Sequence, residues 1–160
     1  MNYKALPSQA LLRERFDYDP ASGEFRYKNG DLVCPESKSR YLLPSVNGER
    51  YLIHRLIWKW MTGEDPLCEV DHRDRNKRNN KWNNLRLADS SQNQGNIGSF
   101  GKSRFRGVCW NKPKGMWRAQ LRSKAFKRIK DFITEEEAAL AWNQWAVEAW
   151  GEFAFQNEMG

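Results

Sequence analysis

"EVDHRDRNKRNNKWNNLRLADSSQNQGN" (Glu69 to Asn96) is the stretch from which the fold and the chemistry of this chain are inferred. Its first residues, together with the preceding Cys68, read "CEVDH" and are typical of a short strand. The segment "NLRLA" is typical of a second strand. Between them lies a polar loop, "RDRNKRNNKWN". The last part, "DSSQNQGN", starts with the Asp and Ser that favour a helix N-terminus. The pattern predicts strand, loop, strand and helix in that order.

The residue types in this stretch suit phosphodiester hydrolysis. That reaction needs a deprotonated water and charge neutralisation on the phosphorane and the leaving oxygen. A neutral His72 can take the proton near pH 7, and a hard divalent cation on oxygen side chains can supply the rest. The side chains of adjacent strand residues point to opposite faces of the strand. Asp71 and His72 can therefore act on the same substrate only if the substrate lies across the end of the strand or if the backbone turns there. The alternative is that the asparagines merely cap turns, which explains each one but not the set.

The charge of the chain points to an anionic partner. The net charge is +7 and the pI is about 9.5, and the two signs are segregated. Residues 101–130 contain eleven Lys or Arg and no acid, whereas residues 131–160 contain seven Asp or Glu and no Lys or Arg. A merely soluble chain would intermix its charges. We therefore expect a basic binding surface, with a solvated basic face as the alternative.

Length and cysteine content exclude several classes of protein. The 160 residues suffice for one ordinary domain or two very small ones. No run approaches the roughly 20 apolar residues of a membrane span, and the N-terminus does not resemble a secretory signal. Cys34, Cys68 and Cys109 are odd in number and far apart, which argues against disulfides and zinc knuckles. We expect a cytoplasmic monomer with no membrane partner and no small-molecule cofactor.

The N-terminal third is expected to form short strands and turns. Residues 1–50 contain Asp-Pro, Ser-Gly and Asn-Gly turn signals between aromatic segments. A hairpin at Asn47-Gly48 should lead into a helix that stops at Gly63. That helix has apolar residues at helical spacing, namely Leu56, Ile57, Trp60 and Met61.

The C-terminal third predicts a three-stranded sheet on one helix. The strands are "FRGVCW", "MWRAQLR" and "KRIKDF", and the helix begins with Thr134 and Glu137 in capping-box relation. In the second strand one face is apolar and the other carries hydrogen-bond donors, with Trp117, Ala119 and Leu121 alternating with Arg118, Gln120 and Arg122. The helix has an apolar stripe, made of Ala138, Ala141, Trp142, Trp145 and Ala149.

The motifs "VDH", "NNLR" and "NQGN", preceded by "HRLIW", resemble the HNH endonuclease family in its phage HNN-type homing-endonuclease branch. The resemblance covers about residues 10–98. It implies a nuclease domain over 1–98, with a ββα-metal element at about 68–97. It also implies that Asp71 and Asn93 bind Mg²⁺ or Mn²⁺, that His72 is the general base and that Asn84 braces the His loop. If a phage encodes the chain, it acts in the host cytoplasm.

Three positions in this motif have alternatives. Asn83 is an alternative to Asn84, and Asn96 lies one helical turn after Asn93. His54, at the start of the first helix, is either a surface histidine or a catalytic residue that supports the site or faces the phosphate. The loop cations are expected on the nucleic-acid backbone, and they are Arg73, Arg75, Lys77, Arg78 and Lys81.

The motifs "FRGVCW", "WRAQLR" and "TEEEAALAWNQWAVEAWGEFAFQN" resemble the Apetala-two/ethylene-response-factor type of DNA-binding domain over about residues 103–157. The expected domain is 104–160, after a linker at 99–103. In that family the sheet enters the major groove, where Arg reads guanine and Gln reads adenine. The implied DNA contacts are Arg104, Arg106, Trp110, Arg118, Gln120, Arg122, Arg128 and Lys130, with Lys124 and Lys127 as phosphate contacts. Trp117 should pack on the helix. The segment "CWNKPKGM" differs from the first turn of the plant proteins of this family. The DNA sequence that those proteins prefer therefore cannot be assigned to this chain.

The sequence thus predicts an α+β protein, and it is consistent with three hypotheses about function. The first is a metal-dependent endonuclease that nicks or cuts double-stranded DNA and is targeted by its C-terminal module. The second is a non-catalytic DNA-binding regulator with a relic nuclease element. The third is a protein directed at RNA, which sheet-borne aromatics would allow, although an Arg/Gln row fits a duplex major groove better.

Overall fold

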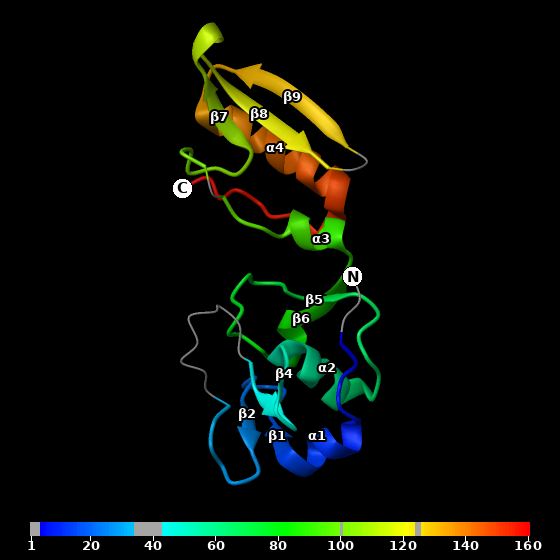
Figure 1. Ribbon diagram of the computed structural model, residues 1–160. Helices are drawn as coiled ribbons and strands as arrows, with labels where there is room; N and C mark the ends of the chain where they lie inside the picture. Colours follow the sequence, from blue (N-terminus) through cyan, green and yellow to red (C-terminus); the bar gives the residue numbers. More distant parts are fainter. Residues whose placement is uncertain (1–3, 34–42, 100, 124–125) are drawn as a thin grey trace. The chain divides into compact units, whose positions relative to one another are not determined.

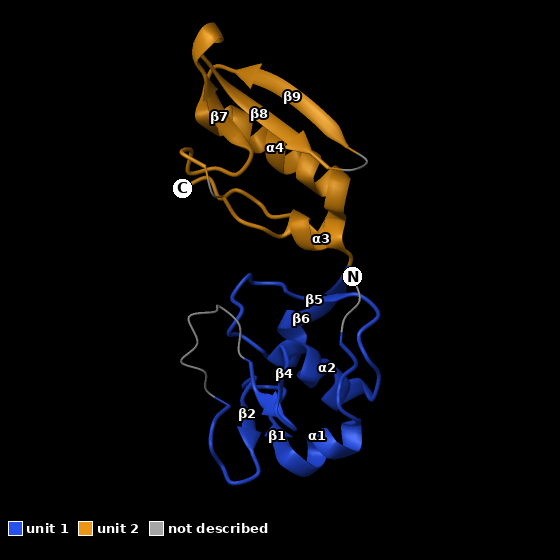
Figure 2. Cartoon of the chain, in the orientation of Figure 1, with its two compact units in different colours: residues 1–88 blue, residues 89–160 orange. Residues whose placement is uncertain are grey.

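The chain folds into two compact units, residues 1–88 and residues 89–160 (Figure 2). The computed structural model describes residues 4–33, 43–99, 101–123 and 126–160. Both units combine helices with small antiparallel sheets, which confirms the α+β fold class. Cys34 and Lys124 lie outside the described residues.

Among its described residues, unit 1 has two α-helices and three antiparallel strand pairs, and its buried residues form one core. Figure 1 shows the path of the chain. The core residues include Leu12, Phe16, Ile53, Leu56 and Ile57, none more than 1% exposed. The elements in chain order are α1 (Gln9–Arg15), β1 (Phe16–Tyr18), β2 (Phe25–Tyr27), β3 (Ser45–Val46), β4 (Glu49–Arg50), α2 (Ile53–Thr62), β5 (Glu69–His72), the 3₁₀ turn η1 (Trp82–Asn84) and β6 (Leu85–Ala88).

The hairpin and the end of α2 confirm the prediction. Asn47 and Gly48 both have positive φ, 52° and 80°, as a two-residue turn between twisted strands requires. Gly63, with φ 80°, caps α2 in the left-handed conformation. Because glycine adopts this conformation without a Cβ clash, the helix ends where the sequence predicts.

Helix α1 corrects the expectation of only strands and turns in residues 1–50. The Ser8 hydroxyl accepts a hydrogen bond from the backbone N–H of Leu11, 3.3 Å away, and so caps the helix. Leu12, one turn further on, is fully buried. The helix is short and its stability comes from packing of that face, which the turn signals downstream do not reveal.

Unit 2 is built on the expected three-stranded sheet and helix. The sheet is antiparallel in the order β7-β8-β9, and α4 packs on one of its faces (Figure 1). The elements are α3 (Ser90–Gly95), β7 (Val108–Asn111), η2 (Lys112–Lys114), β8 (Met116–Arg122), β9 (Lys127–Phe132), α4 (Glu135–Trp150) and η3 (Gly151–Phe153). Thr134 and Glu137 form the predicted capping box at the start of α4.

The division between the units differs from the sequence prediction, which places a linker at 99–103. Helix α3 packs within unit 2, because Trp150 of α4 covers it and donates from Nε1 to the Ser91 hydroxyl at 3.2 Å. The backbone N–H of Phe155 also donates to the carbonyl of Gly95. A six-residue helix is marginal by itself, so these contacts decide which unit contains α3.

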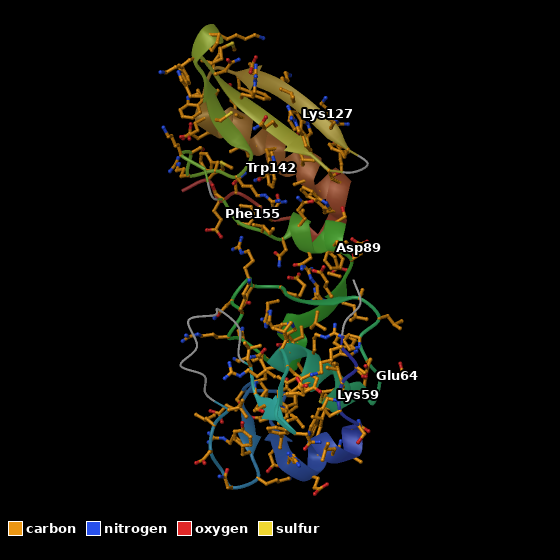
Figure 3. All side chains as sticks on the ribbon, viewed as in Figure 1. Lys59, Glu64, Asp89, Lys127, Trp142 and Phe155 are labelled. Atoms are coloured by element: carbon orange, nitrogen blue, oxygen red, sulfur yellow. The ribbon has the colours of Figure 1, made fainter. Side chains whose placement is uncertain are left out.

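The core of unit 2 is aromatic and is closed by the C-terminal segment. The rings of Trp142 and Phe155 lie 6.4 Å apart (Figure 3). Gly107, with φ 72°, passes directly under Trp142, and a Cβ there would lie 2.0 Å from its Nε1 atom. Asn157 is 6% exposed and exchanges two hydrogen bonds with the backbone of Arg106. The tail is therefore part of the unit.

Among the described residues, the structure has no helix with the length and apolar character that a membrane crossing requires.

Candidate active site and basic sheet

The strand pair β5-β6 brings Asp71 opposite Arg86. One carboxylate oxygen of Asp71, Oδ2, accepts a hydrogen bond from Nε of Arg86 at 3.0 Å and forms an ion pair with Nη2, also at 3.0 Å. Both side chains are at most 8% exposed. A buried charge requires a partner of this kind, and the planar guanidinium also fixes the plane of the carboxylate.

His72 ends β5 and is 3% exposed. Its Nε2 atom lies 3.2 Å from Oδ1 of Asn80. An amide oxygen accepts hydrogen bonds, so Nε2 carries the proton and Nδ1 has the lone pair in the neutral ring. The His54 ring of α2 meets the His72 ring edge to face, with centroids 5.1 Å apart.

Burial keeps both histidines neutral at pH 7. Burial lowers the pKa of His54 to about 3, and the charges of His72, Arg55 and Lys77 act in the same direction. Burial also lowers the pKa of His72, although the bond to Asn80 and the carboxylates of Asp71 and Asp74 oppose that shift. A neutral imidazole is the form that can accept a proton.

Asn84 holds the loop that follows His72. Its Nδ2 donates to Oδ1 of Asp74 at 2.9 Å and to the carbonyl of Asn79 at 2.7 Å. Its Oδ1 accepts from the backbone N–H of Asp74. Asn84 is 7% exposed, whereas Asn83 is exposed. Of the two alternatives, Asn84 is therefore the one that braces this loop.

The loop after His72 contains the five expected cations. Lys77 is half-buried, and the others, Arg73, Arg75, Arg78 and Lys81, are exposed. Arg75 adopts a positive φ of 66°, and its backbone N–H donates to the carbonyl of His72. The turn at Arg75 thus directs the chain away from the strand immediately after the histidine.

The candidate metal ligands are Asp71, in unit 1, and Asn93, which is half-buried on α3 of unit 2. Asn96 is 7% exposed and caps the C-terminus of α3 through its backbone N–H. Within the described ranges, no group of three or more His, Cys, Asp or Glu side chains could hold a metal ion.

Asn80 and Arg86 are site residues that the sequence analysis misses. Asn80 is 2% exposed and also anchors the loop, because its carbonyl accepts from the Tyr18 hydroxyl at 2.7 Å. Nothing in the sequence separates it from its many neighbouring asparagines. Arg86 did leave a signal, since a cation between Leu85 and Leu87 in a predicted strand needs a buried partner.

The register of the unit 2 sheet separates two faces. Trp117, Ala119 and Leu121 of β8 face α4, and Ala119 and Leu121 are at most 2% exposed. The opposite face is open and contains the predicted row of Arg118, Gln120 and Arg122. We call this the outward face. From β9, residues directly opposite this row are Asp131, Ile129 and Lys127.

Three expected DNA contacts lie on the other side of the sheet. Residues paired across strands share a face, and Trp110 pairs with Trp117, Arg128 with Leu121 and Lys130 with Ala119. Arg128 forms an ion pair with Glu148 of α4 at 2.8 Å. The strand register therefore places these three residues on the helix side of the sheet and the outward row on the opposite side.

Arg106 also requires a correction, because it is 9% exposed. Its Nη2 donates to the carbonyl of Gln94 at 2.8 Å, and Nη1 donates to the carbonyls of Gly95 and Ile97. The guanidinium lies over the rings of Trp142 and Trp150. Burial lowers the pKa of Arg106 to about 10, so it stays charged at pH 7. It caps the end of α3, whereas Arg104 is exposed in an ion pair with Glu136.

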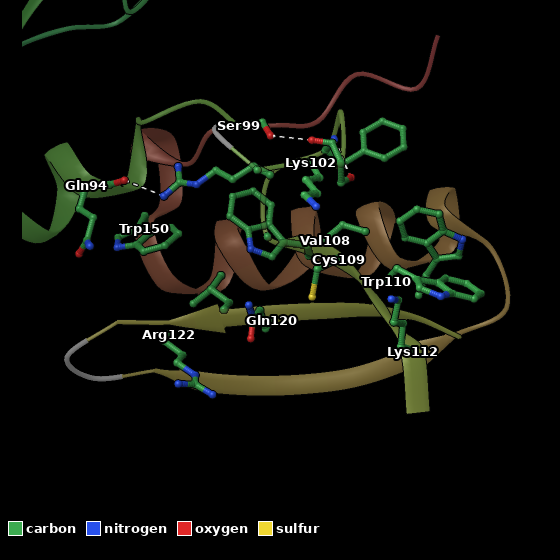
Figure 4. Close-up of a pocket in the computed structure, with 18 residues that line it drawn as sticks. Gln94, Ser99, Lys102, Val108, Cys109, Trp110, Lys112, Gln120, Arg122 and Trp150 are labelled. Carbon is green, nitrogen blue, oxygen red and sulfur yellow. Dashed lines mark hydrogen bonds between the residues drawn. The ribbon is translucent and has the colours of Figure 1, made fainter. Parts of the chain in front are cut away.

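A groove of about 750 Å³ lies in unit 2 beside β7 (Figure 4). Its lining combines tryptophan rings with cations, among them Trp110, Trp117, Lys102, Lys112 and Arg122. Gln120 of the outward row also lines it. The groove thus borders the outward face and extends its basic character.

The comparisons with known proteins agree with the site in unit 1. Residues 51–94 match the family model described as HNH endonuclease. This range contains His54, Asp71, His72, Asn84 and Asn93. This segment of the chain is therefore similar to the HNH endonuclease family, a class of nucleases.

The chain is 40% identical over 110 residues to an uncharacterized HNH endonuclease of Acanthamoeba polyphaga mimivirus. That alignment covers 67% of this chain and 57% of the viral protein, so the chain matches a little over half of its relative. No solved structure matches the chain.

Proposed function

We propose that this protein is a metal-dependent endonuclease that hydrolyses phosphodiester bonds of double-stranded DNA. The observation that carries the proposal is the buried, neutral His72 next to Asp71, inside the segment that matches the HNH family. Buried ionisable groups of this kind need a reason to be retained, and catalysis is one.

His72 acts as the general base. With Nε2–H donated to Asn80, the Nδ1 lone pair accepts the proton of the attacking water. The bond to Asn80 fixes the tautomer and the orientation of the ring. His54 contacts the His72 ring and remains neutral, so it supports the base without adding a charge. Asn84 keeps the loop after the base in one conformation through its bonds to Asp74 and Asn79.

Asp71 and Asn93 are the proposed ligands of Mg²⁺ or Mn²⁺, and a ββα-metal arrangement of β5, β6 and α3 follows from this assignment. Carboxylate and amide oxygens are the hard donors that these ions prefer. When bound, such an ion neutralises charge on the phosphate and the leaving oxygen. Arg86 orients the Asp71 carboxylate through its hydrogen bond and ion pair to Oδ2.

Unit 2 is the proposed targeting module, similar to the Apetala-two/ethylene-response-factor domains. The support is the outward row on a sheet backed by α4, in which Gln120 and Arg122 are exposed and Arg118 is half-buried. Arginine and glutamine are the side chains that donate to guanine and adenine edges in a major groove. Lys127 and the exposed loop cations of unit 1 would contact phosphates.

The test is cleavage of supercoiled plasmid by the full chain with Mg²⁺, with Mn²⁺ and with excess EDTA. We expect nicked or linear product with either ion and none with EDTA. Undiminished cleavage in EDTA contradicts the metal assignment. Binding of duplex without cleavage under any of these conditions supports the alternative, a non-catalytic DNA-binding regulator. A single-stranded RNA substrate run in parallel distinguishes RNA-directed cleavage.

A further inference from the structure

The outward face of the unit 2 sheet has a negative charge near the end of its edge strand β9. Asp131 is the only acidic residue in the three strands, and all of the strand residues are among those described. It lies opposite Arg118, on the same face as Gln120 and Arg122. An aspartate repels DNA phosphates, so a surface that only held the backbone would gain affinity from its absence.

Four donors converge on this carboxylate. Arg118 donates from Nε to Oδ1 at 2.8 Å and from Nη2 to Oδ2 at 3.2 Å. Lys114 lies 2.9 Å from Oδ2, and Nδ2 of Asn111 lies 3.3 Å from Oδ1. The side chain of Asp131 is only 11% exposed, whereas that of Arg118 is 32% exposed. Asp131 is therefore held from several sides and in turn holds Arg118.

The geometry leaves one edge of the Arg118 guanidinium facing outward. A guanidinium has five N–H donors, and the Asp131 contact uses one on Nε and one on Nη2. The remaining donors, two on Nη1 and one on Nη2, form the fork at the tip of the side chain. This fork is the one that fits O6 and N7 of guanine.

We propose that Asp131 is a specificity-determining positioning residue, which orients Arg118 so that its terminal fork reads a guanine edge. This inference rests on the proposed DNA-binding function of unit 2. Fixing the side chain before binding removes the rotamer entropy that a free arginine would lose on the DNA. Lys114 and Asn111 keep the carboxylate in place when Arg118 contacts the base.

The experiment selects bound duplexes from a random-sequence library with the full-length protein and then measures affinity for the selected and the random pools. The variants are Asp131→Asn, Arg118→Ala, their combination, and Glu148→Gln as a matched control. Glu148→Gln removes the same charge from an ion pair on the helix side of the sheet. Thermal unfolding of every variant shows whether the unit remains folded.

We expect Asp131→Asn to reduce discrimination at one guanine position by about 5- to 150-fold, the value of a good bidentate contact. Affinity for the random pool should be unchanged or higher, since a negative charge is removed. Arg118→Ala should reduce discrimination at the same guanine position. In the double variant, Asp131→Asn should cause no further loss of discrimination. Glu148→Gln should leave the selected sequence unchanged.

Three results with the variants overturn the inference, and one result with the wild-type protein does so as well. Asp131→Asn with wild-type discrimination shows that Arg118 needs no positioning. An Asp131 effect that persists without Arg118 shows that the carboxylate itself reads a base. Equal loss of affinity for both pools shows a purely structural role. If the wild-type protein binds the library but enriches no sequence, unit 2 does not read bases, and this inference fails. If the wild-type protein binds no duplex at all, the proposed DNA-binding function of unit 2 fails.

Discussion

The two units place their functional polar groups in opposite environments. In unit 1, Asp71, His72 and Asn84 are at most 7% exposed and each is held by a named side chain. In unit 2, Gln120 and Arg122 are exposed on an open sheet, and the buried residues are mainly aromatic. Chemistry on a single phosphodiester bond needs fixed, desolvated groups, whereas contact with an extended duplex needs accessible ones.

This difference predicts where substitutions act. A change at the unit 1 site should alter rate with little effect on binding, and a change on the unit 2 sheet should alter binding with little effect on folding. A change in the aromatic core of unit 2 should alter folding.

The largest expected effect is on the cleavage rate. His72→Ala should lower plasmid cleavage by about 10²–10⁴-fold, because that is the contribution of a general base. Affinity for duplex should stay near that of the wild type, since the ring is buried. Initial cleavage rates and binding curves for the two proteins measure this. Full activity in His72→Ala, or an equal loss in His54→Ala alone, would assign the base elsewhere.

The next effect tests the core of unit 2. Gly107→Ala should destabilise this unit by about 3 kcal/mol, because left-handed strain adds to the clash with Trp142. Gly115→Ala is the matched control: its φ is 60° and no atom lies within 4 Å of the added Cβ. It should cost only about 1 kcal/mol. Urea unfolding, followed by hydrogen exchange of unit 2 peptides, measures the free energy of unfolding of both variants. An equal loss of stability in the two would contradict the close contact between Gly107 and Trp142.

A third prediction uses the location of both histidines in unit 1. Burial holds the pKa of His54 at about 3, below the value of about 6.5 in an unfolded chain. The unfolded state therefore binds more protons, and the stability of unit 1 falls as the pH drops below about 6.5. The His54 contribution is about 1.4 kcal/mol per pH unit.

Hydrogen exchange at pH 6.5 and pH 5 measures this effect in each unit. Unit 2, which contains no histidine, lacks this contribution. In His54→Gln the stability of unit 1 should change less with pH than in the wild type. An unchanged slope in that variant would show that His54 is protonated in the folded protein.

The smallest effect separates the two faces of the unit 2 sheet. Lys127→Ala should weaken binding to all duplexes and reduce the slope of log affinity against log salt concentration by about one unit. Arg128→Ala removes the same charge from the helix side, where Glu148 already neutralises it, and should change the slope less. Binding isotherms at several salt concentrations decide. Equal slopes for the two variants would contradict the assignment of the DNA-binding face.

Periodicity and capping predicted most of the secondary structure. The alternation in "MWRAQLR" matches β8 to the residue, and Thr134 with Glu137 locates the start of α4. These signals are local, so one sequence suffices to detect them. The placement of α3 in unit 2 depends on distant residues, Arg106 and Trp150, whose contacts leave no local pattern.

The same limit applies to the candidate site. Asp71, His72 and Asn84 were identified from the motif, and the structure brings Asn84 to the loop after His72. Asn80 was missed because its role depends on a loop conformation that includes a positive φ at Arg75. The opposite faces of Arg118 and Arg128 follow from strand register, which charge counting ignores. The metal-binding role of Asn93 stays a prediction.

The Arg106 cap on α3 has a consequence for exchanging parts between proteins of this kind. The loop after residue 98 looks like a natural junction, but a chimera joined at 104 would separate the guanidinium from the carbonyls of residues 94, 95 and 97. The charge would then remain between two tryptophan rings without its acceptors. A fusion that begins at Asp89 transfers the cap, the helix and the capping carboxylate together. The transferable part of this chain is therefore longer than its basic sheet.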